Sequence, residues 1–158
     1  MRSAFAAELY KHMTLDPDIV LITMDLGMGM WDEIRKNYPK RFFNVGASEQ
    51  AGLDIAVGMA QSGKKVFVYS ITPFLLYRGF ETIRTWIDHE KVPIRLVGSG
   101  RNDNYKHDGF SHDATDAKRI LDTLPHIISL WPESKEEIPL LVKQMVDRNQ
   151  PVFISLKR

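Results

Sequence analysis

Short runs of aliphatic, β-branched and aromatic residues recur along the chain, and stretches with helical periodicity separate them. Each run is continuously hydrophobic rather than alternating, which is typical of strands that are buried on both faces. The runs are IVLITM from Ile19, RFFNV from Arg41, KVFVYS from Lys65, PIRLVG from Pro93, HIISL from His126 and PVFISL from Pro151. This order of elements predicts an α/β fold, a three-layer αβα domain around a mostly parallel sheet of about six strands.

Three of the intervening stretches show an apolar stripe at helical spacing. The first covers residues 2–13, the second begins near Glu49, and the third lies before the last strand. Ser134 and Glu137 have the spacing of a capping box at the start of the third stretch. Pro139 is tolerated only in the first turn of a helix, so we expect this helix to begin later than the capping box implies.

The chain has the length and composition of one folded unit. It contains 158 residues, of which 44% are hydrophobic and 26% are charged. Because there is no internal repeat, low-complexity tract or linker, we expect a single domain over residues 1–158. The 21 basic and 20 acidic residues are scattered and give a net charge of +1, which does not favour a nucleic-acid partner.

The absence of cysteine excludes disulfides, thiolate metal sites and cysteine nucleophiles. The first residues, MRSAFAAELYKHM, include Glu8 and lack the apolar core of a signal peptide. No apolar run approaches the roughly 20 residues that a membrane-spanning helix needs. We therefore expect a cytoplasmic protein without a membrane partner.

Ligands of open parallel sheets gather beyond the carboxyl ends of the strands. This rule selects three segments for closer attention, at Val45–Gln50, Ser70–Phe80 and Gly98–His112. In the first segment, Glu49 falls in the first turn of a predicted helix. An acidic residue at that place complements the helix dipole and can cap free amides, which is a sufficient structural explanation of Glu49 taken alone.

The stretch RFFNVGASEQAGLDIAVGMAQSG, from Arg41 to Gly63, resembles the R-F-x-N-x-G-x-x-E signature of the transketolase-like pyrimidine-binding domain. This family includes transketolases, deoxyxylulose-phosphate synthases and 2-oxoacid dehydrogenase β subunits. The resemblance extends to the small residues after Gly52, which let a helix lie close to a neighbour. It places Glu49 on the acid that activates thiamine diphosphate. In that role, a carboxyl group bonded to the pyrimidine N1′ favours the imino tautomer, whose N4′ then removes the C2 proton.

The segment YSITPFLLYRGF carries Phe74, Tyr77 and Phe80 at three-residue spacing, which would place them on one face of a helix. Core packing explains such an aromatic stripe when it is taken alone. In the resembling family an aromatic segment at this place forms the pyrimidine pocket. The resemblance implies that Tyr77 stacks on the cofactor ring, with Phe74 and Phe80 beside it. Solvent, the partner chain and an anionic substrate are the alternatives for Arg78, and of these we expect solvent.

GSGRNDNYKHDGFSHDA is the longest polar stretch of the chain, and both a solvated loop and a binding loop explain it. Its Asp108 and His112 match the D-G-x-[ST]-H motif of the family, which implies that both contact the substrate and that His112 donates to a developing alkoxide. Arg101 sits at the spacing of a substrate-phosphate arginine in deoxyxylulose-phosphate synthases. From His107 and His112 we expect no metal site, because their spacing is not a recognised ligand pattern.

The last segment resembles the final strand of the family, which ends in an arginine that contacts substrate phosphate in transketolases. Arg158 is therefore a further substrate-binding candidate, and a charged tail that keeps an edge strand in solution is the structural alternative.

The resemblance covers essentially the whole chain, but the family's diphosphate-binding domain and its metal ligands have no counterpart here. We therefore expect a separate diphosphate-binding transketolase subunit, which holds Mg²⁺ or Ca²⁺ and assembles with this chain into a two-plus-two heterotetramer. The expected function is a split transketolase that uses thiamine diphosphate to transfer a two-carbon ketol unit between sugars. A deoxyxylulose-phosphate-synthase-like or 2-oxoacid-decarboxylating subunit is one alternative, and a non-catalytic assembly or regulatory subunit is another.

Overall fold

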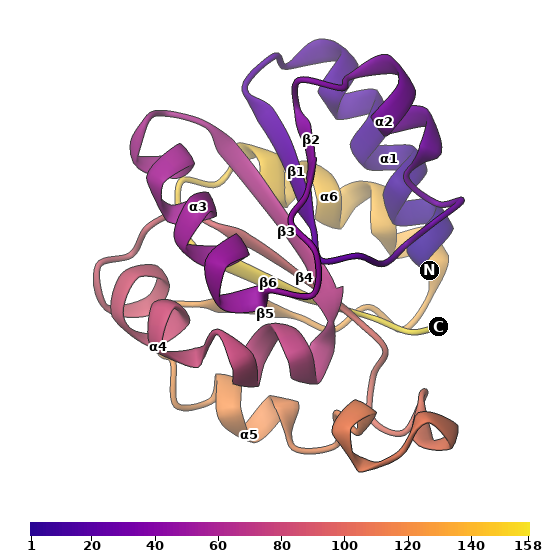
Figure 1. Cartoon of the computed structure of the whole chain (residues 1–158), viewed down its shortest axis with the longest axis vertical. Coiled ribbons are helices and arrows are strands. Elements are labelled where there is room, and N and C mark those ends of the chain that lie inside the picture. The colour runs from indigo at the N-terminus through magenta and orange to yellow at the C-terminus, as the bar shows by residue number, and fades with distance from the viewer.

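A six-stranded sheet forms the centre of the structure, and every neighbouring pair of strands in it is parallel (Figure 1). The computed structural model describes residues 1–158. The strands are β1 (Ile19–Thr23), β2 (Phe42–Asn44), β3 (Lys65–Ile71), β4 (Arg95–Ser99), β5 (Ile128–Leu130) and β6 (Val152–Leu156). Their order in the sheet is β2-β1-β3-β4-β6-β5. The six predicted strands and the three-layer α/β class are therefore confirmed.

Helices cover both faces of this sheet (Figure 1). One face carries α1 (Arg2–Leu15), α2 (Asp32–Asn37) and α6 (Ile138–Asp147), and the other carries α3 (Glu49–Gln61), α4 (Phe80–Thr82) and α5 (Ala117–Leu121). Two π-helical segments, Phe74–Arg78 and Ile83–His89, flank α4. Short 3₁₀ turns cover Lys106–Asp108, Phe110–His112 and Lys135–Glu137. No helix combines the length and the apolar character that crossing a bilayer requires.

The predicted apolar stripes face the sheet. Phe5, Leu9 and Met13 of α1 are fully buried in a core that α1 and α6 form with one face of the sheet. Leu53 and Ala56 of α3 are fully buried in a second core on the opposite face. Burial of a side chain as large as phenylalanine, leucine or methionine stabilises the fold by roughly 1.5–3 kcal/mol. These two cores therefore hold α1 and α3, whose first turns both reach the carboxyl edge of the sheet.

The last helix begins in the way the proline predicts. Ser134 and Glu137 form the capping box, and the Oε1 atom of Glu137 accepts from the backbone N–H of Ser134 at 2.7 Å. A 3₁₀ turn follows, and the α-helix starts only at Ile138, with Pro139 in its first turn. Proline costs no hydrogen bond there, because the first amides of a helix have no partner within it.

The point at which successive connections turn to opposite faces of the sheet lies next to the predicted ligand loops. β1 lies between β2 and β3, and the connections on its two sides run over opposite faces of the sheet through α2 and α3. Ligand sites of open α/β sheets lie at such a switch point, beyond the carboxyl ends of the strands. The segments that follow β1, β2 and β3 meet at this point, and the long polar loop follows the neighbouring β4.

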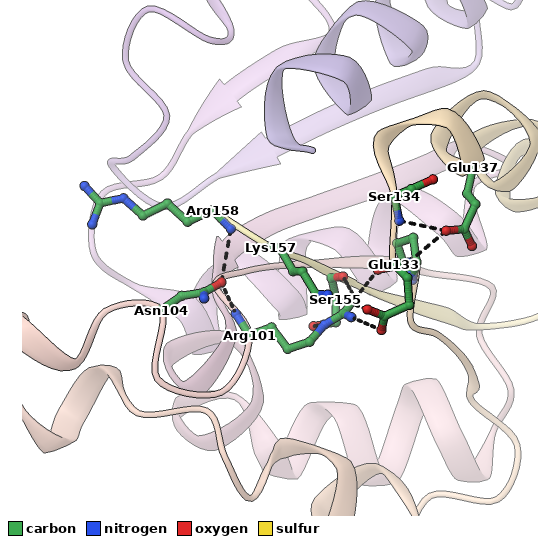
Figure 2. Close-up of polar contacts among 9 residues, drawn as sticks. Arg101, Asn104, Glu133, Ser134, Glu137, Ser155, Lys157 and Arg158 are labelled. Carbon is green, nitrogen blue, oxygen red and sulfur yellow. Dashed lines mark hydrogen bonds and ion pairs between the residues drawn. The ribbon is translucent and has the colours of Figure 1, made fainter.

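A buried arginine ties the end of β4 to β6 (Figure 2). Arg101 is 6% exposed. Its Nε donates to the Ser155 hydroxyl at 3.2 Å, and its Nη2 donates to the carbonyl oxygens of Pro132 and Ser155 at 2.8 and 2.6 Å. Its Nη1 donates to Glu133 at 2.9 Å. Burial lowers the pKa of Arg101, and the charge of Glu133 opposes this shift.

We expect that Arg101→Met will lower the free energy of unfolding by about 2–3 kcal/mol, because two buried carbonyl groups lose their donors. Arg119→Met is the matched control, since Arg119 is exposed on α5 and its loss should change stability by no more than about 0.5 kcal/mol. Urea unfolding followed by circular dichroism measures both variants. An Arg101→Met protein with the midpoint of the unaltered chain would contradict the structural role of Arg101.

Candidate active site

The site is centred on Glu49, the first residue of α3. Its side chain is only 2% exposed. The carboxylate accepts a hydrogen bond from the Ser70 hydroxyl of β3 at 3.1 Å and another from Nη1 of Arg78 at 3.0 Å. The structure shows no side-chain cap at the start of α3, so helix capping does not explain the burial of this acid. Three elements, α3, β3 and the first π-helical segment, converge on one charged group.

α3 lies close to the end of β1 because it has a glycine at the point of contact. A Cβ atom on Gly52 would lie 2.5 Å from the Met24 side chain and 3.0 Å from Val45. The family resemblance anticipated this close approach. It applies to Gly52 but not to Gly58, where an added Cβ would meet no atom of this chain. The close packing at Gly52 brings Glu49, one turn earlier, against the carboxyl end of the sheet.

Arg78 is exposed, as expected, and it also contacts the site. Its side chain is 47% exposed, but its guanidinium pairs with Glu49 and lies 3.7 Å from the ring centroid of Phe74. Phe74 and Arg78 are four residues apart in a π-helical segment, whose turn is wider than an α-helical turn. Residues four apart share a face there, which explains why the arginine covers both the ring and the acid.

The three aromatic residues predicted to form the pocket occupy different environments, because the segment is π-helical. Phe74 is partly buried and has Arg78 over its face. Tyr77 is exposed and its hydroxyl donates to Asp116, next to the start of α5; burial and the Asp116 carboxylate raise the pKa of Tyr77. Phe80 packs against the core that contains α3. In a π-helical turn residues three apart no longer share a face. Of the three aromatic side chains, Phe74 is the one that Arg78 links to Glu49.

The polar loop places the predicted substrate residue His112 against Phe74 and leaves Asp108 exposed. The ring of His112 packs edge-on against Phe74, with centroids 4.7 Å apart. Its Nδ1 lies 3.1 Å from the Ser111 hydroxyl. Asp108 is exposed and lies 3.3 Å from Nε2 of His107, which is also 3.2 Å from Nη1 of Arg158. Asp108 and Arg158 are thus linked through His107, whereas His112 is the residue next to the aromatic segment.

Arg101 is not part of this group. Four of its hydrogen bonds go to Ser155, Pro132 and Glu133, as described above. Figure 2 shows Arg101 pointing into that buried cluster, whereas the side chain of Arg158 extends away from it. A buried guanidinium with these partners has a structural role, so the geometry does not support the expectation that Arg101 contacts a substrate phosphate.

Tyr105 and Arg2 are candidate site residues that the sequence pattern does not indicate. The Tyr105 ring fills the space beside Gly100, whose φ is 83° and whose added Cβ would lie 2.3 Å from that ring. The Tyr105 hydroxyl accepts from Nη1 of Arg2 at 2.9 Å and lies 3.0 Å from the Ser99 hydroxyl. The guanidinium carbon of Arg158 is 5.1 Å from the ring centroid. No local signal links Arg2 to a tyrosine 103 residues away.

Arg2 also lines a cavity of about 320 Å³ at the carboxyl edge of the sheet. The hydroxyl of Tyr69 at this cavity is buried without a hydrogen-bond partner, and burial raises the pKa of Tyr69. The guanidinium of Arg2 and the hydroxyl groups offer hydrogen-bond donors to an acceptor-rich group. The lining residues are Arg2, Ser3, Gly27, Met28, Gly29, Met30 and Tyr69.

Comparison with known proteins identifies the family of this chain. A model described as the transketolase pyrimidine-binding domain matches residues 1–158. A putative transketolase C-terminal section from Methanocaldococcus jannaschii is 26% identical over 100% of this chain and 50% of its own length. One of the subunits of the apulose-4-phosphate transketolase from Phocaeicola vulgatus is 28% identical over 99% of this chain and 51% of its own length. The chain thus spans about half the length of these relatives.

A 1-deoxy-D-xylulose-5-phosphate synthase from Clostridium botulinum is 30% identical over 98% of this chain and 25% of its own length. Among solved structures, a split-gene transketolase described as an inactive β4 tetramer superposes with a TM-score of 0.88 and 27% identity, over 99% of this chain and 51% of that one. The buried acid at the start of α3, the six-stranded parallel sheet and these likenesses agree. The chain therefore belongs to the transketolase pyrimidine-binding domain family.

Proposed function

We propose that this chain is the pyrimidine-domain subunit of a two-chain, thiamine-diphosphate-dependent transketolase, with residues 1–158 as its single domain. The observation that carries the proposal is Glu49, a carboxylate that is 2% exposed at the carboxyl edge of the sheet and is held by Ser70 and Arg78. Two relatives that match this chain throughout, a transketolase section and a transketolase subunit, support a split enzyme.

The residues around Glu49 fit the aminopyrimidine of thiamine diphosphate, the cofactor that transketolases and deoxyxylulose-phosphate synthases use. They offer a carboxylate acceptor and the face of an aromatic ring, and the flat, nitrogen-bearing guanidinium of Arg78 contacts both. Phe74 would therefore stack on the pyrimidine ring, and Glu49 would bind its N1′. This geometry favours Phe74 over Tyr77 and Phe80 as the stacking residue, and the latter two would support the pocket from its sides.

Thiamine diphosphate, when bound, supplies a nucleophilic carbon after loss of its C2 proton. The part of this chain in that chemistry is to position a proton: Glu49 would hold it at the pyrimidine N1′ in a space from which water is excluded. Ser70 is fully buried and donates to the other carboxylate oxygen, so it fixes the orientation of Glu49.

The substrate would lie on the side of Phe74 that His112 contacts. An imidazole N–H of His112 would donate to the oxygen of the substrate carbonyl as negative charge develops there. Asp108 would accept from a sugar hydroxyl. Arg2 and Arg158, which both contact Tyr105, would bind a phosphate group, and the unpartnered Tyr69 hydroxyl lies at the cavity beside Arg2. These two cations favour a phosphorylated sugar.

The partner would be a separate chain that binds the diphosphate and its Mg²⁺ or Ca²⁺, in a two-plus-two heterotetramer. Two large apolar side chains are almost fully exposed on loops that follow β1 and β4, Met28 at 92% and Phe110 at 94%. Methionine and aromatic side chains are enriched at protein–protein interfaces. They lie on loops of the carboxyl edge, the edge at which Glu49 is found, which suits a cofactor bound between two chains.

The deoxyxylulose-phosphate synthase from Clostridium botulinum, at 30% identity, keeps a second activity open. The residue that favoured this activity was Arg101, and its burial against Ser155 and Glu133 removes that support. Assays of the reconstituted pair for two-carbon transfer between sugars and for release of carbon dioxide from pyruvate separate the two activities.

We expect that Glu49→Gln will lower the turnover of the assembled enzyme by at least about 100-fold, because an amide cannot hold the proton at N1′. Glu81→Gln is the matched control, since Glu81 is exposed on α4. Steady-state assays with sugar donors and acceptors measure both variants. Unchanged turnover of Glu49→Gln would contradict the catalytic proposal. It would favour the alternative that this chain is a non-catalytic assembly or regulatory subunit.

We expect that Arg2→Met will raise the KM for a phosphorylated sugar by roughly 10- to 100-fold, because it removes a charge-assisted hydrogen bond. The KM for the same sugar without its phosphate should change little. Arg119→Met serves again as the control. Equal losses with both sugars would show that Arg2 acts only through the packing of Tyr105 and would argue against a phosphate at this position.

A further inference from the structure

Arg78 contacts both Glu49 and Phe74. Its Nη1 donates to Oε2 of Glu49 at 3.0 Å, and its guanidinium carbon lies 3.7 Å from the ring centroid of Phe74. The arginine side chain is 47% exposed and the acid beneath it is 2% exposed. Arg78 therefore lies between solvent and the buried carboxylate, stacked on the neighbouring aromatic ring.

These two contacts are the ones that the proposed function assigns to the cofactor. A guanidinium is flat, carries nitrogen donors and stacks on aromatic faces. An aminopyrimidine that stacks on Phe74 and bonds to Glu49 has the same requirements. Because two flat groups cannot occupy one face of Phe74 together, the cofactor and the guanidinium of Arg78 exclude one another.

We propose that Arg78 is a placeholder for the cofactor: in the free chain its guanidinium occupies the pyrimidine position on Glu49 and Phe74, and it must withdraw into solvent when thiamine diphosphate binds. This inference rests on the proposed function, since it assumes that Glu49 receives the pyrimidine ring. It assigns Arg78 a positioning role that acts through Glu49.

The physical reason for a placeholder is the cost of a buried charge. An ionised carboxylate that is removed from water is strongly unfavourable unless cations or hydrogen-bond donors balance it. Ser70 supplies one neutral donor to Glu49, and Arg78 supplies the only side-chain cation in contact with it. The arginine thus supplies the cation that balances Glu49 until another donor takes its place.

The position of Arg78 also allows its side chain to move away from Glu49 into solvent. It is the last residue of the π-helical segment Phe74–Arg78, and nearly half of its side chain already faces solvent. Ser70, by contrast, is fully buried in β3 and remains in place. Exchange of the guanidinium for the pyrimidine ring therefore requires a side-chain rotation of Arg78 and leaves the second donor to Glu49 intact.

A placeholder lowers the apparent affinity for the cofactor, because only the fraction of molecules with Arg78 withdrawn can bind it. We expect Arg78→Met to lower the Kd of the assembled complex for thiamine diphosphate, at saturating Mg²⁺, by about tenfold if about nine in ten molecules hold the Arg78–Glu49 pair before the cofactor binds. Arg84→Met is the matched control, since Arg84 is an exposed arginine of the next π-helical segment, and its Kd should equal that of the unaltered complex. Isothermal titration calorimetry gives these constants without an activity assay. Unchanged or weaker binding by Arg78→Met overturns the placeholder.

A second measurement uses this chain alone and needs no cofactor. Arg78→Met should lower the urea midpoint of the chain when Glu49 is present and should have little effect in a Glu49→Gln background, because the pair is then already lost. Equal effects in both backgrounds would show that Arg78 does not balance Glu49 and would overturn the inference.

The two proposals fail in different ways. If Glu49→Gln abolishes turnover but Arg78→Met leaves the cofactor Kd unchanged, the placeholder is wrong and the proposed function stands. If Glu49→Gln leaves turnover unchanged, or the assembled complex does not bind thiamine diphosphate, the proposed function is wrong and the placeholder has no cofactor to replace.

Discussion

The buried carboxyl group of Glu49 imposes the main constraint on this structure. A carboxyl group that is 2% exposed must find hydrogen-bond donors from elsewhere in the fold. Ser70 from β3 and Arg78 from the π-helical segment supply them, so the start of α3, the end of β3 and the segment after it are held together. The close approach of α3 to the sheet at Gly52 is what brings the acid to these donors.

Burial separates the roles of the arginines near the carboxyl edge. Arg101 is 6% exposed and bonds to Pro132, Glu133 and Ser155, which makes it a tie between β4 and β6. Arg2 and Arg158 contact Tyr105, and both are less buried than Arg101. The arginines thus differ in how many of their N–H groups are free to bind a ligand.

Local backbone geometry explains the largest difference between expectation and structure at the site. The spacing of Phe74, Tyr77 and Phe80 predicts one aromatic face only if the segment is an α-helix. The segment Phe74–Arg78 is π-helical, so Tyr77 turns toward Asp116 while Arg78 comes to lie over Phe74. A π-helical turn depends on how the segment packs against its neighbours, and single-sequence periodicity carries no sign of it.

The sequence by itself determined about six strands in a mostly parallel sheet, the apolar stripes of α1 and α3, the late start of α6, and the place of Glu49 at the start of a helix after β2. These features depend on hydrophobic periodicity and on residues a few positions apart, which local physical chemistry governs. Only the tertiary structure decided that Arg78 covers Glu49, that Arg101 is buried and that Arg2 reaches Tyr105. Those contacts join residues 29 to 103 positions apart, and their formation depends on which elements the two hydrophobic cores bring to the same edge of the sheet.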